Sequence, residues 1–174
     1  TVIDHYRLPS SGGGSEAEDV IWKARQERIF RQQLELAVEQ NLNVVVHQRA
    51  ALDATLAIFE QYSDRTRAQF HCFVDDVASM RRIVEMGSLV SFTGIVTFKN
   101  AEEVRETISA TPLDKLMLET DSPFLAPVPH RGKRCEPSFT RHVAERVAEM
   151  KMVSLDELSE VTNATARAFF SKLA

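Results

Sequence analysis

The chain has 174 residues, of which 44% are hydrophobic and 26% are charged. This length and composition suffice for one folded domain and are unlike those of disordered or fibrous chains. The formal net charge of −4 argues against a protein that coats nucleic acid through a basic surface, because such binding needs many Lys and Arg contacts to phosphate. It does not exclude an enzyme that takes one strand end into a metal site, where the ions supply the positive charge.

Cysteine content and hydropathy indicate which cellular compartment the chain is expected to occupy. Cys72 and Cys135 are the only cysteines, so no disulfide framework is expected and a reduced, cytoplasmic setting fits best. No apolar run approaches the roughly 20 residues that span a bilayer, so no membrane association is expected. The chain opens directly in a strand-like segment without an initiator Met, and this opening predicts that it is the later part of something longer.

Strand-like and helix-like segments alternate along the chain, which predicts βα units, a parallel sheet and a single domain over residues 1–174. The first helix is expected to begin at Ser15, because Ser15 and Glu18 have capping-box spacing. Its expected apolar stripe consists of Val20, Ile21, Ala24, Phe30, Leu34, Ala37 and Val38. Strands are expected to end near Asp4, His47, His71, Phe92 and Asp121, and further helices to cover 52–62, 75–87, 101–108, 138–150, 155–161 and 164–173.

Three of these expected strands lead to side chains that bind metal ions. Apolar runs precede His47, His71 and Asp121, and Pro123 cannot continue the last strand. In a barrel the carboxyl ends of the strands meet at one rim, where two histidines and an aspartate can hold a metal ion. Each histidine alone is more often a structural strand-end residue, but equivalent positions on separate strands favour a metal site. The ligand types do not choose between Zn, Mn and Mg.

Further candidates lie beside these three residues. Arg49 follows His47 by two positions and is compatible with a phosphate or carboxylate clamp, or with a solvated loop position. Glu119 precedes Asp121 by two, so it either orients a ligand or lies in the interior with a partner. A dense basic cluster after the last strand is compatible with contact to a negatively charged substrate or with plain solvation: His130, Arg131, Lys133 and Arg134.

Several motifs resemble those of the TatD family of metal-dependent deoxyribonucleases. The matching segments run in order over nearly the whole chain: Val46-His47-Gln48-Arg49, His71-Cys72-Phe73, Ser91-Phe92-Thr93-Gly94-Ile95, Glu119-Thr120-Asp121-Ser122-Pro123-Phe124-Leu125-Ala126-Pro127, and the loop from Pro129 to Pro137. The resemblance implies a TIM (β/α)8 barrel, a site for two divalent ions (Mg, Mn or Zn) and hydrolysis of DNA phosphodiester bonds, often from the 3′ end of single strands.

The resemblance also implies roles for individual residues. His47 and His71 would bind one metal and Asp121 the other, with Asp121 as the catalytic carboxylate that accepts a proton from the attacking water. Arg49 and the cluster His130, Arg131, Lys133 and Arg134 would contact flanking phosphates of the substrate.

The departures from the family pattern are as informative as the matches. The His-x-His pair of the family's first strand does not occur, and the family's bridging glutamate would fall immediately before Thr1. A full barrel needs eight βα units and roughly 250 residues. We therefore expect a barrel that is incomplete at its N-terminus and that pairs with a second copy or with a missing N-terminal segment. Two alternatives stay open: a catalytically incompetent fragment or interaction subunit lacking half the metal site, and a metal-dependent amide or ester hydrolase.

Overall fold

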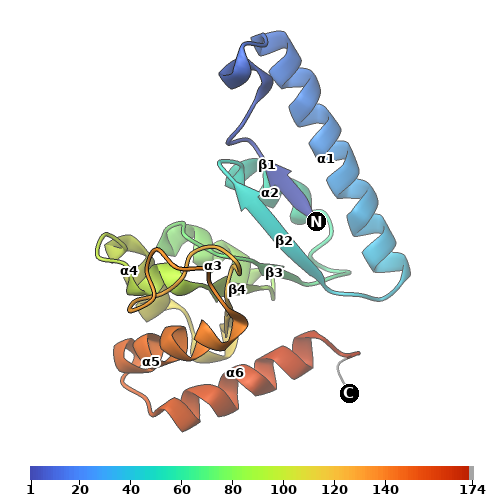
Figure 1. The fold of residues 1–174 in the computed structure, drawn as a ribbon. Coiled ribbons are helices and arrows are strands. Elements are labelled where there is room, and N and C mark those ends of the chain that lie inside the picture. Colours follow the sequence, from blue (N-terminus) through green and yellow to red (C-terminus); the bar gives the residue numbers. More distant parts are fainter. Residues whose placement is uncertain (173–174) are drawn as a thin grey trace. The chain divides into compact units, whose positions relative to one another are not determined.

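Parallel strands connected by helices make up the fold in a computed structural model of the chain, which describes residues 1–172 (Figure 1). The chain divides into two units, Thr1–Phe70 and His71–Ala174, and each unit is described by itself. The parallel α/β fold class expected from the sequence is confirmed. A single domain over 1–174 stays a prediction, and the expected helix end at Leu173 lies outside the described residues.

The first unit contains a parallel sheet of three strands with two helices. In chain order its elements are β1 (Val2–Asp4), the 3-10 helix η1 (Pro9–Gly12), α1 (Glu16–Glu39), β2 (Val44–Arg49), α2 (Leu52–Phe59) and β3 (Ala68–Phe70). The β1–β2 register pairs Val2 with His47 and Asp4 with Arg49. This register brings the polar residues of the two strands next to each other.

Helix α1 begins as its sequence predicts but buries less of its apolar stripe than expected. Ser15 is the N-cap, and the reciprocal hydrogen bonds of a capping box with Glu18 are both present. The buried residues of the helix are Phe30, Leu34 and Ala37, whereas Val20 and Ile21 are 68% and 53% exposed. The expected stripe is therefore wrong for the first turns, because the helix buries side chains only from Phe30 onward.

The second unit combines two paired parallel strands with helices and 3-10 turns. Its elements are α3 (Val77–Glu85), β4 (Leu89–Phe92), η2 (Gly94–Thr97), α4 (Glu102–Ala110), η3 (Leu113–Lys115), β5 (Leu116–Leu118), η4 (Pro137–Phe139), α5 (Thr140–Lys151) and α6 (Leu155–Phe169). Strands β4 and β5 pair in parallel with Phe92 opposite Leu118. Helices α5 and α6 lie side by side (Figure 1). Asp76 caps α3, which lies within the helix expected over 75–87.

Helix α6 runs without a break from Leu155 to Phe169, so the expectation of two helices over 155–161 and 164–173 is wrong at their junction. The polar residues there find partners within the helix. Thr162 Oγ1 donates to the carbonyl of Leu158 at 2.8 Å, and Asn163 Nδ2 donates to Ser159 Oγ at 3.1 Å. Side chains satisfied in this way need not divert the backbone from helical hydrogen bonding. Within the described part of the chain, every helix is too short or too polar to cross a bilayer.

Candidate metal-binding residues at the strand ends

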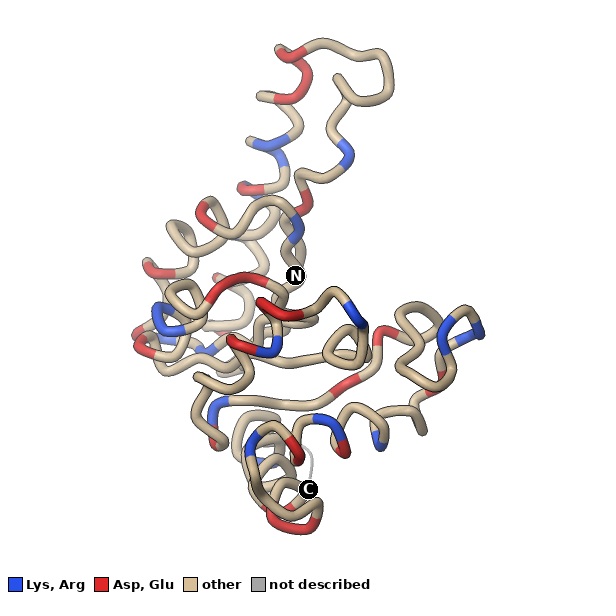
Figure 2. The backbone as a smooth tube through the Cα atoms, turned by 90° about the vertical axis from the view of Figure 1, so that its left-hand side faces the viewer, with Lys and Arg blue, Asp and Glu red and all other residues tan. Residues whose placement is uncertain are grey.

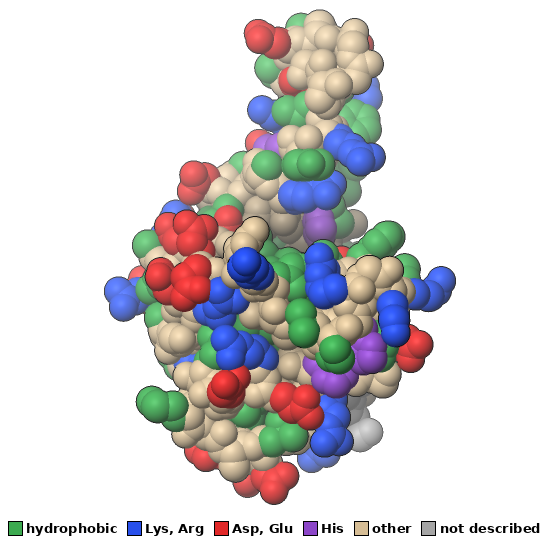
Figure 3. Space-filling view, turned by 60° about the vertical axis from the view of Figure 1, so that its left-hand side comes forward, with side chains coloured by type: hydrophobic (Ala, Val, Ile, Leu, Met, Phe, Trp, Pro, Cys, Tyr) green, Lys and Arg blue, Asp and Glu red, His purple; other side chains and the backbone are tan. Residues whose placement is uncertain are grey.

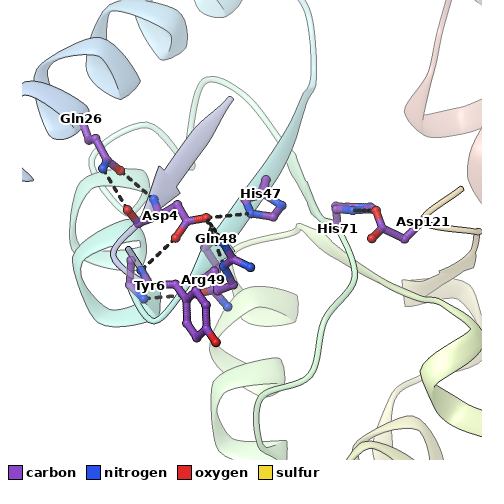
Figure 4. A network of polar contacts seen from close by, with 9 residues as sticks. Asp4, Tyr6, Gln26, His47, Gln48, Arg49, His71 and Asp121 are labelled. Atoms are coloured by element: carbon purple, nitrogen blue, oxygen red, sulfur yellow. Dashed lines mark hydrogen bonds and ion pairs between the residues drawn. The ribbon is translucent and has the colours of Figure 1, made fainter. Parts of the chain in front are cut away.

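Asp4 is the centre of a polar network in the first unit (Figure 4). Arg49 Nη2 lies 2.9 Å from Asp4 Oδ2, and the backbone N–H of Tyr6 donates to Asp4 Oδ1 at 2.8 Å. His47 Nε2 is 3.8 Å from the same Oδ2. Gln26 on α1 fixes the end of β1 by bonding both the N–H and the carbonyl of Asp4, at 2.7 and 2.9 Å. Helix α1 thereby positions a carboxylate beside a histidine.

The charge of this carboxylate follows from its neighbours. Burial raises the pKa of Asp4, but the hydrogen bonds from Tyr6 and Arg49 outweigh burial and leave the pKa below its ordinary value. Asp4 is therefore ionised at neutral pH. The guanidinium of Arg49 also lies over the Tyr6 ring, 4.3 Å from its centre. His47 does not end its strand as expected, because β2 continues to Arg49, and its side chain is 40% exposed.

His71 and Asp121 lie together in the second unit (Figure 4). His71 directly follows β3, and its Nδ1 lies 2.8 Å from Glu119 Oε1 while its Nε2 lies 3.4 Å from Asp121 Oδ1. The hydrogen bond with Glu119, supported by the charges of Glu119 and Asp121, raises the pKa of His71 against the opposing effect of burial. An ionised carboxylate only accepts hydrogen bonds, so Nδ1 carries the proton. In the neutral ring, Nε2 is then the lone-pair nitrogen, and it faces Asp121.

Glu119 binds three donors at the end of β5. Besides His71 Nδ1, its Oε1 accepts from Ser91 Oγ and from the backbone N–H of Cys72, both at 2.7 Å. The β4–β5 pairing continues with a hydrogen bond from the N–H of Glu119 to the carbonyl of Phe92, which brings the carboxylate beside Ser91. Burial raises the pKa of Glu119, but the three hydrogen bonds together keep the pKa below its usual value. Both roles left open for Glu119 are thus combined: it lies inside with partners, and it orients His71.

The donor chemistry of each unit fits a divalent ion in part. Each unit brings one imidazole and one carboxylate together, and imidazole nitrogen and carboxylate oxygen are ligands for Zn, Mn or Mg. A carboxylate behind the ring, as Glu119 lies behind His71, is the usual support of a metal-binding histidine. Within residues 1–172, however, no group of three or more His, Cys, Asp or Glu side chains could hold a metal by itself. His47 and His71 belong to different units, so their sharing of one ion stays a prediction.

The loop after Asp121 carries the expected basic cluster. Arg131 lies over the Phe98 ring at 3.6 Å from its centre, and His130 stacks flat on Phe139 at 4.1 Å. Lys133 and Arg134 are exposed. Basic and acidic positions are interspersed along both units (Figure 2), so the cluster is a local feature. Contact of Arg49 and of this cluster with substrate stays a prediction.

Ser91 and Gly94 belong to a segment that resembles the family's motifs, but the sequence assigned neither residue a role. Ser91 is a buried polar residue within the apolar strand Leu89–Phe92, and that interruption is the signal that could have identified it. At Gly94 a Cβ would overlap the Leu125 carbonyl oxygen and approach the Pro127 nitrogen to 2.9 Å. Only glycine lets the loop after Asp121 approach η2 this closely.

Parallel strands joined by helices, with functional side chains near the strand ends, are the arrangement of the α/β barrel class. The sequence matches the family described as TatD related DNase over residues 15–171. The chain belongs to the TatD family. It is 40% identical over 163 residues to the metal-dependent hydrolase YcfH of Escherichia coli K12, covering 93% of this chain and 57% of that protein. It is 39% identical over 146 residues to the metal-dependent hydrolase YabD of Bacillus subtilis, covering 83% of this chain and 57% of YabD.

Solved structures show the same fold. The TatD homologue YjjV from Escherichia coli K12 superposes with a TM-score of 0.84 at 23% identity, over 98% of this chain and 61% of that one. A TatD family hydrolase from Entamoeba histolytica superposes with a TM-score of 0.74 at 17% identity, over 97% of this chain and 61% of its own. The TIM-barrel fold class expected from the sequence is confirmed. The chain spans about three fifths of the length of these relatives.

Proposed function

We propose that the protein acts as a metal-dependent hydrolase on DNA phosphodiester bonds, with single-stranded ends as the preferred substrate. The observation that carries the proposal is the arrangement of His71: Glu119 holds its Nδ1, and its Nε2 faces Asp121. A histidine prepared in this way needs no rearrangement to bind a cation. Membership in the TatD family, whose relatives YcfH and YabD are named metal-dependent hydrolases, supports the same reaction class.

We assign His71 and Asp121 as metal ligands in the second unit and His47 as a ligand in the first. Two divalent ions (Mg, Mn or Zn), when bound, would lower the pKa of a water and neutralise charge on the phosphate oxygens. Asp121 is 36% exposed, so its carboxylate can reach a water and accept its proton. Glu119 keeps the proton of His71 on Nδ1 throughout. Asp4 is ionised beside His47, and its Oδ2 pairs with the guanidinium of Arg49.

The substrate assignment draws on the basic residues around these ligands. Arg131, Lys133 and Arg134 are exposed in the loop after Asp121, and Arg49 is half exposed beside Asp4. Together with His130 they are proposed to contact phosphates, which sets the register of a strand without reading its sequence. Pairing with a second copy or with an N-terminal segment is proposed as the way in which the sheet is completed.

The test is hydrolysis of a 3′-labelled single-stranded oligonucleotide by the 174-residue chain, with Mg²⁺, Mn²⁺ or Zn²⁺ added singly. We expect Asp121→Asn to reduce the rate about a thousandfold, because the variant loses both a ligand and a proton acceptor. Asp114→Asn is the matched control. Asp114 is 66% exposed beside Lys115 in the same unit, and the variant should keep the parental rate.

Three results would overturn parts of the proposal. Full turnover by Asp121→Asn would remove the role of that residue. Cleavage of amide or ester substrates instead of the oligonucleotide would replace DNA as the substrate and keep the hydrolase class. If the chain hydrolyses none of these substrates and equilibrium dialysis finds no bound Mg²⁺ or Mn²⁺, this chain is an incompetent fragment or an interaction subunit.

A further inference from the structure

Two histidines of the second unit meet where the basic loop approaches helix α5. His130 Nε2 lies 3.2 Å from His142 Nε2, with ring centres 5.0 Å apart. His142 Nδ1 lies 3.2 Å from Glu145 Oε2. Hydrogen bonds from Arg141 and His142 outweigh burial and hold the pKa of Glu145 below its usual value, so its carboxylate is ionised and accepts the Nδ1 proton. The lone pair of neutral His142 is then on Nε2, toward His130.

The spacing of the rings matches two ligands of one transition ion. Imidazole nitrogens about 2.0–2.1 Å from an ion, at a near-tetrahedral angle, lie about 3.3 Å apart with ring centres about 5 Å apart. The observed separations are 3.2 Å and 5.0 Å. Rings joined end to end by one hydrogen bond of that length would have their centres roughly 5.5 Å apart. The two rings therefore meet at an angle and not end to end, and this is the arrangement of two imidazoles that share one ion.

Each ring is fixed in orientation, and the pair is open to solvent. His130 stacks on Phe139 with 8° between the ring planes, and Glu145 holds His142 from behind. His142 also lines an open groove of about 1240 Å³ together with Arg146 and Glu149. Neighbouring histidine side chains are visible at the surface in Figure 3. Fixed rings lower the entropic cost of binding an ion, and the groove admits water to its remaining coordination positions.

We propose that His130 and His142 bind a divalent transition ion such as Cu²⁺ or Zn²⁺, with Glu145 as a positioning residue behind His142. Since residues 1–172 contain no group of three suitable side chains, the site has two protein ligands, and water completes the coordination. Such a site is exchangeable, favours Cu²⁺ over Zn²⁺ and excludes Mg²⁺, which prefers oxygen ligands. Ion binding joins the basic loop to α5, so His130 is an ion ligand while the ion is bound and is available to contact substrate phosphate when the ion has dissociated.

The experiment follows the imidazole Hε1 signals by NMR during titration with ZnCl2. The chain has five histidines, and the background His47→Gln/His71→Gln removes the two that belong to the proposed hydrolytic site. Two of the three remaining signals should shift together and saturate at one equivalent of zinc. His130→Phe, which keeps an aromatic ring on Phe139, and His142→Gln assign them. Either substitution should weaken zinc binding at least about tenfold, and Glu145→Gln about tenfold.

His5→Gln in the same background is the matched control and should leave the titration unchanged. MgCl2 at the same concentrations should move neither signal. Circular dichroism verifies that each variant is folded. The proposal is overturned if zinc leaves both signals in place, if only one of them shifts, or if folded His130→Phe or Glu145→Gln binds zinc as tightly as the parent. None of these outcomes depends on nuclease activity, so this proposal and the proposed function fail separately.

Discussion

The two units each hold a histidine beside an aspartate, and what lies behind each pair differs. In the second unit, His71 is supported by the carboxylate of Glu119, which is itself held by Ser91 and Cys72. In the first unit, the aspartate has the charged partner, because Asp4 forms an ion pair with the guanidinium of Arg49. A carboxylate behind a histidine strengthens the ring as a metal ligand, whereas an arginine on an aspartate competes with a cation for the same oxygens. The second unit is therefore prepared for a metal, and the first must release Arg49.

The largest expected effect tests the support behind His71. Glu119→Leu leaves the Nδ1 proton of His71, the hydroxyl of Ser91 and the N–H of Cys72 without their acceptor. Unsatisfied donors of this kind cost roughly 1–3 kcal/mol each, so we expect the free energy of unfolding to fall by about 3 kcal/mol after allowance for hydroxyl rotation and solvent access. Urea denaturation followed by circular dichroism, in chelator-treated buffer, measures the change.

Asp4→Leu is the matched substitution in the first unit. Its partners Arg49 and His47 are 50% and 40% exposed and can turn to water, so the expected loss is about 1 kcal/mol. Equal losses for the two variants would contradict the difference drawn between the supported and the solvated pair. A loss for Glu119→Leu below that for Asp4→Leu would reverse it.

The second comparison concerns the loops that follow the two aspartates. In the second unit, a Cβ at Gly94 would overlap the backbone of Leu125 and Pro127, so Gly94→Ala forces a backbone shift in the loop after Asp121. We expect the unfolding free energy to fall by about 2 kcal/mol, because backbone atoms cannot move aside as a flexible side chain would. Urea denaturation again provides the measurement.

Gly12 is the control glycine in the loop after Asp4. A Cβ there meets nothing within 4 Å, and Gly12→Ala should change the unfolding free energy by less than about 0.5 kcal/mol. If Gly94→Ala were tolerated as well as Gly12→Ala, the loop after Asp121 would not be held by its contact with η2. The basic cluster that follows in this loop would then have no fixed position.

Local signals in the sequence were enough to predict most of the fold. The capping box at Ser15, the helix expected over 75–87 and the alternation of apolar runs with helices correspond to elements in the structure. Such signals act over a few residues and do not require knowledge of the tertiary fold. The exposed first turns of α1 and the unbroken α6 could not be read in this way. Burial of a stripe depends on what packs against it, and a helix continues through polar residues when their side chains find partners within it.

The candidate site likewise contains features that the sequence predicts and features that only the tertiary structure determines. His71 and Asp121 could be named from the sequence because strand-end positions and family motifs identify them. The ion pair between Asp4 and Arg49 could not be predicted from the sequence. It follows from the β1–β2 register, which pairs two residues 45 apart in the chain. The convergence of three donors on Glu119 likewise needs the pairing of β4 with β5. Sequence patterns therefore identified ligand types, and the tertiary structure decided their hydrogen-bonding state.

The smallest expected effect uses Cys72, which adjoins the support of His71. Its Sγ lies 3.4 Å from Thr93 Oγ1, and burial raises the pKa of the thiol to about 11. Burial keeps the thiol protonated up to about pH 11, whereas a solvated thiol would ionise near its ordinary pKa of 9.0. We expect alkylation by iodoacetamide, measured by mass spectrometry in a Cys135→Ala background, to accelerate about tenfold per pH unit up to pH 11. A plateau already near pH 9 would mean that the surroundings of Glu119 are as open to water as those of Asp4, and the contrast between the two units would be lost.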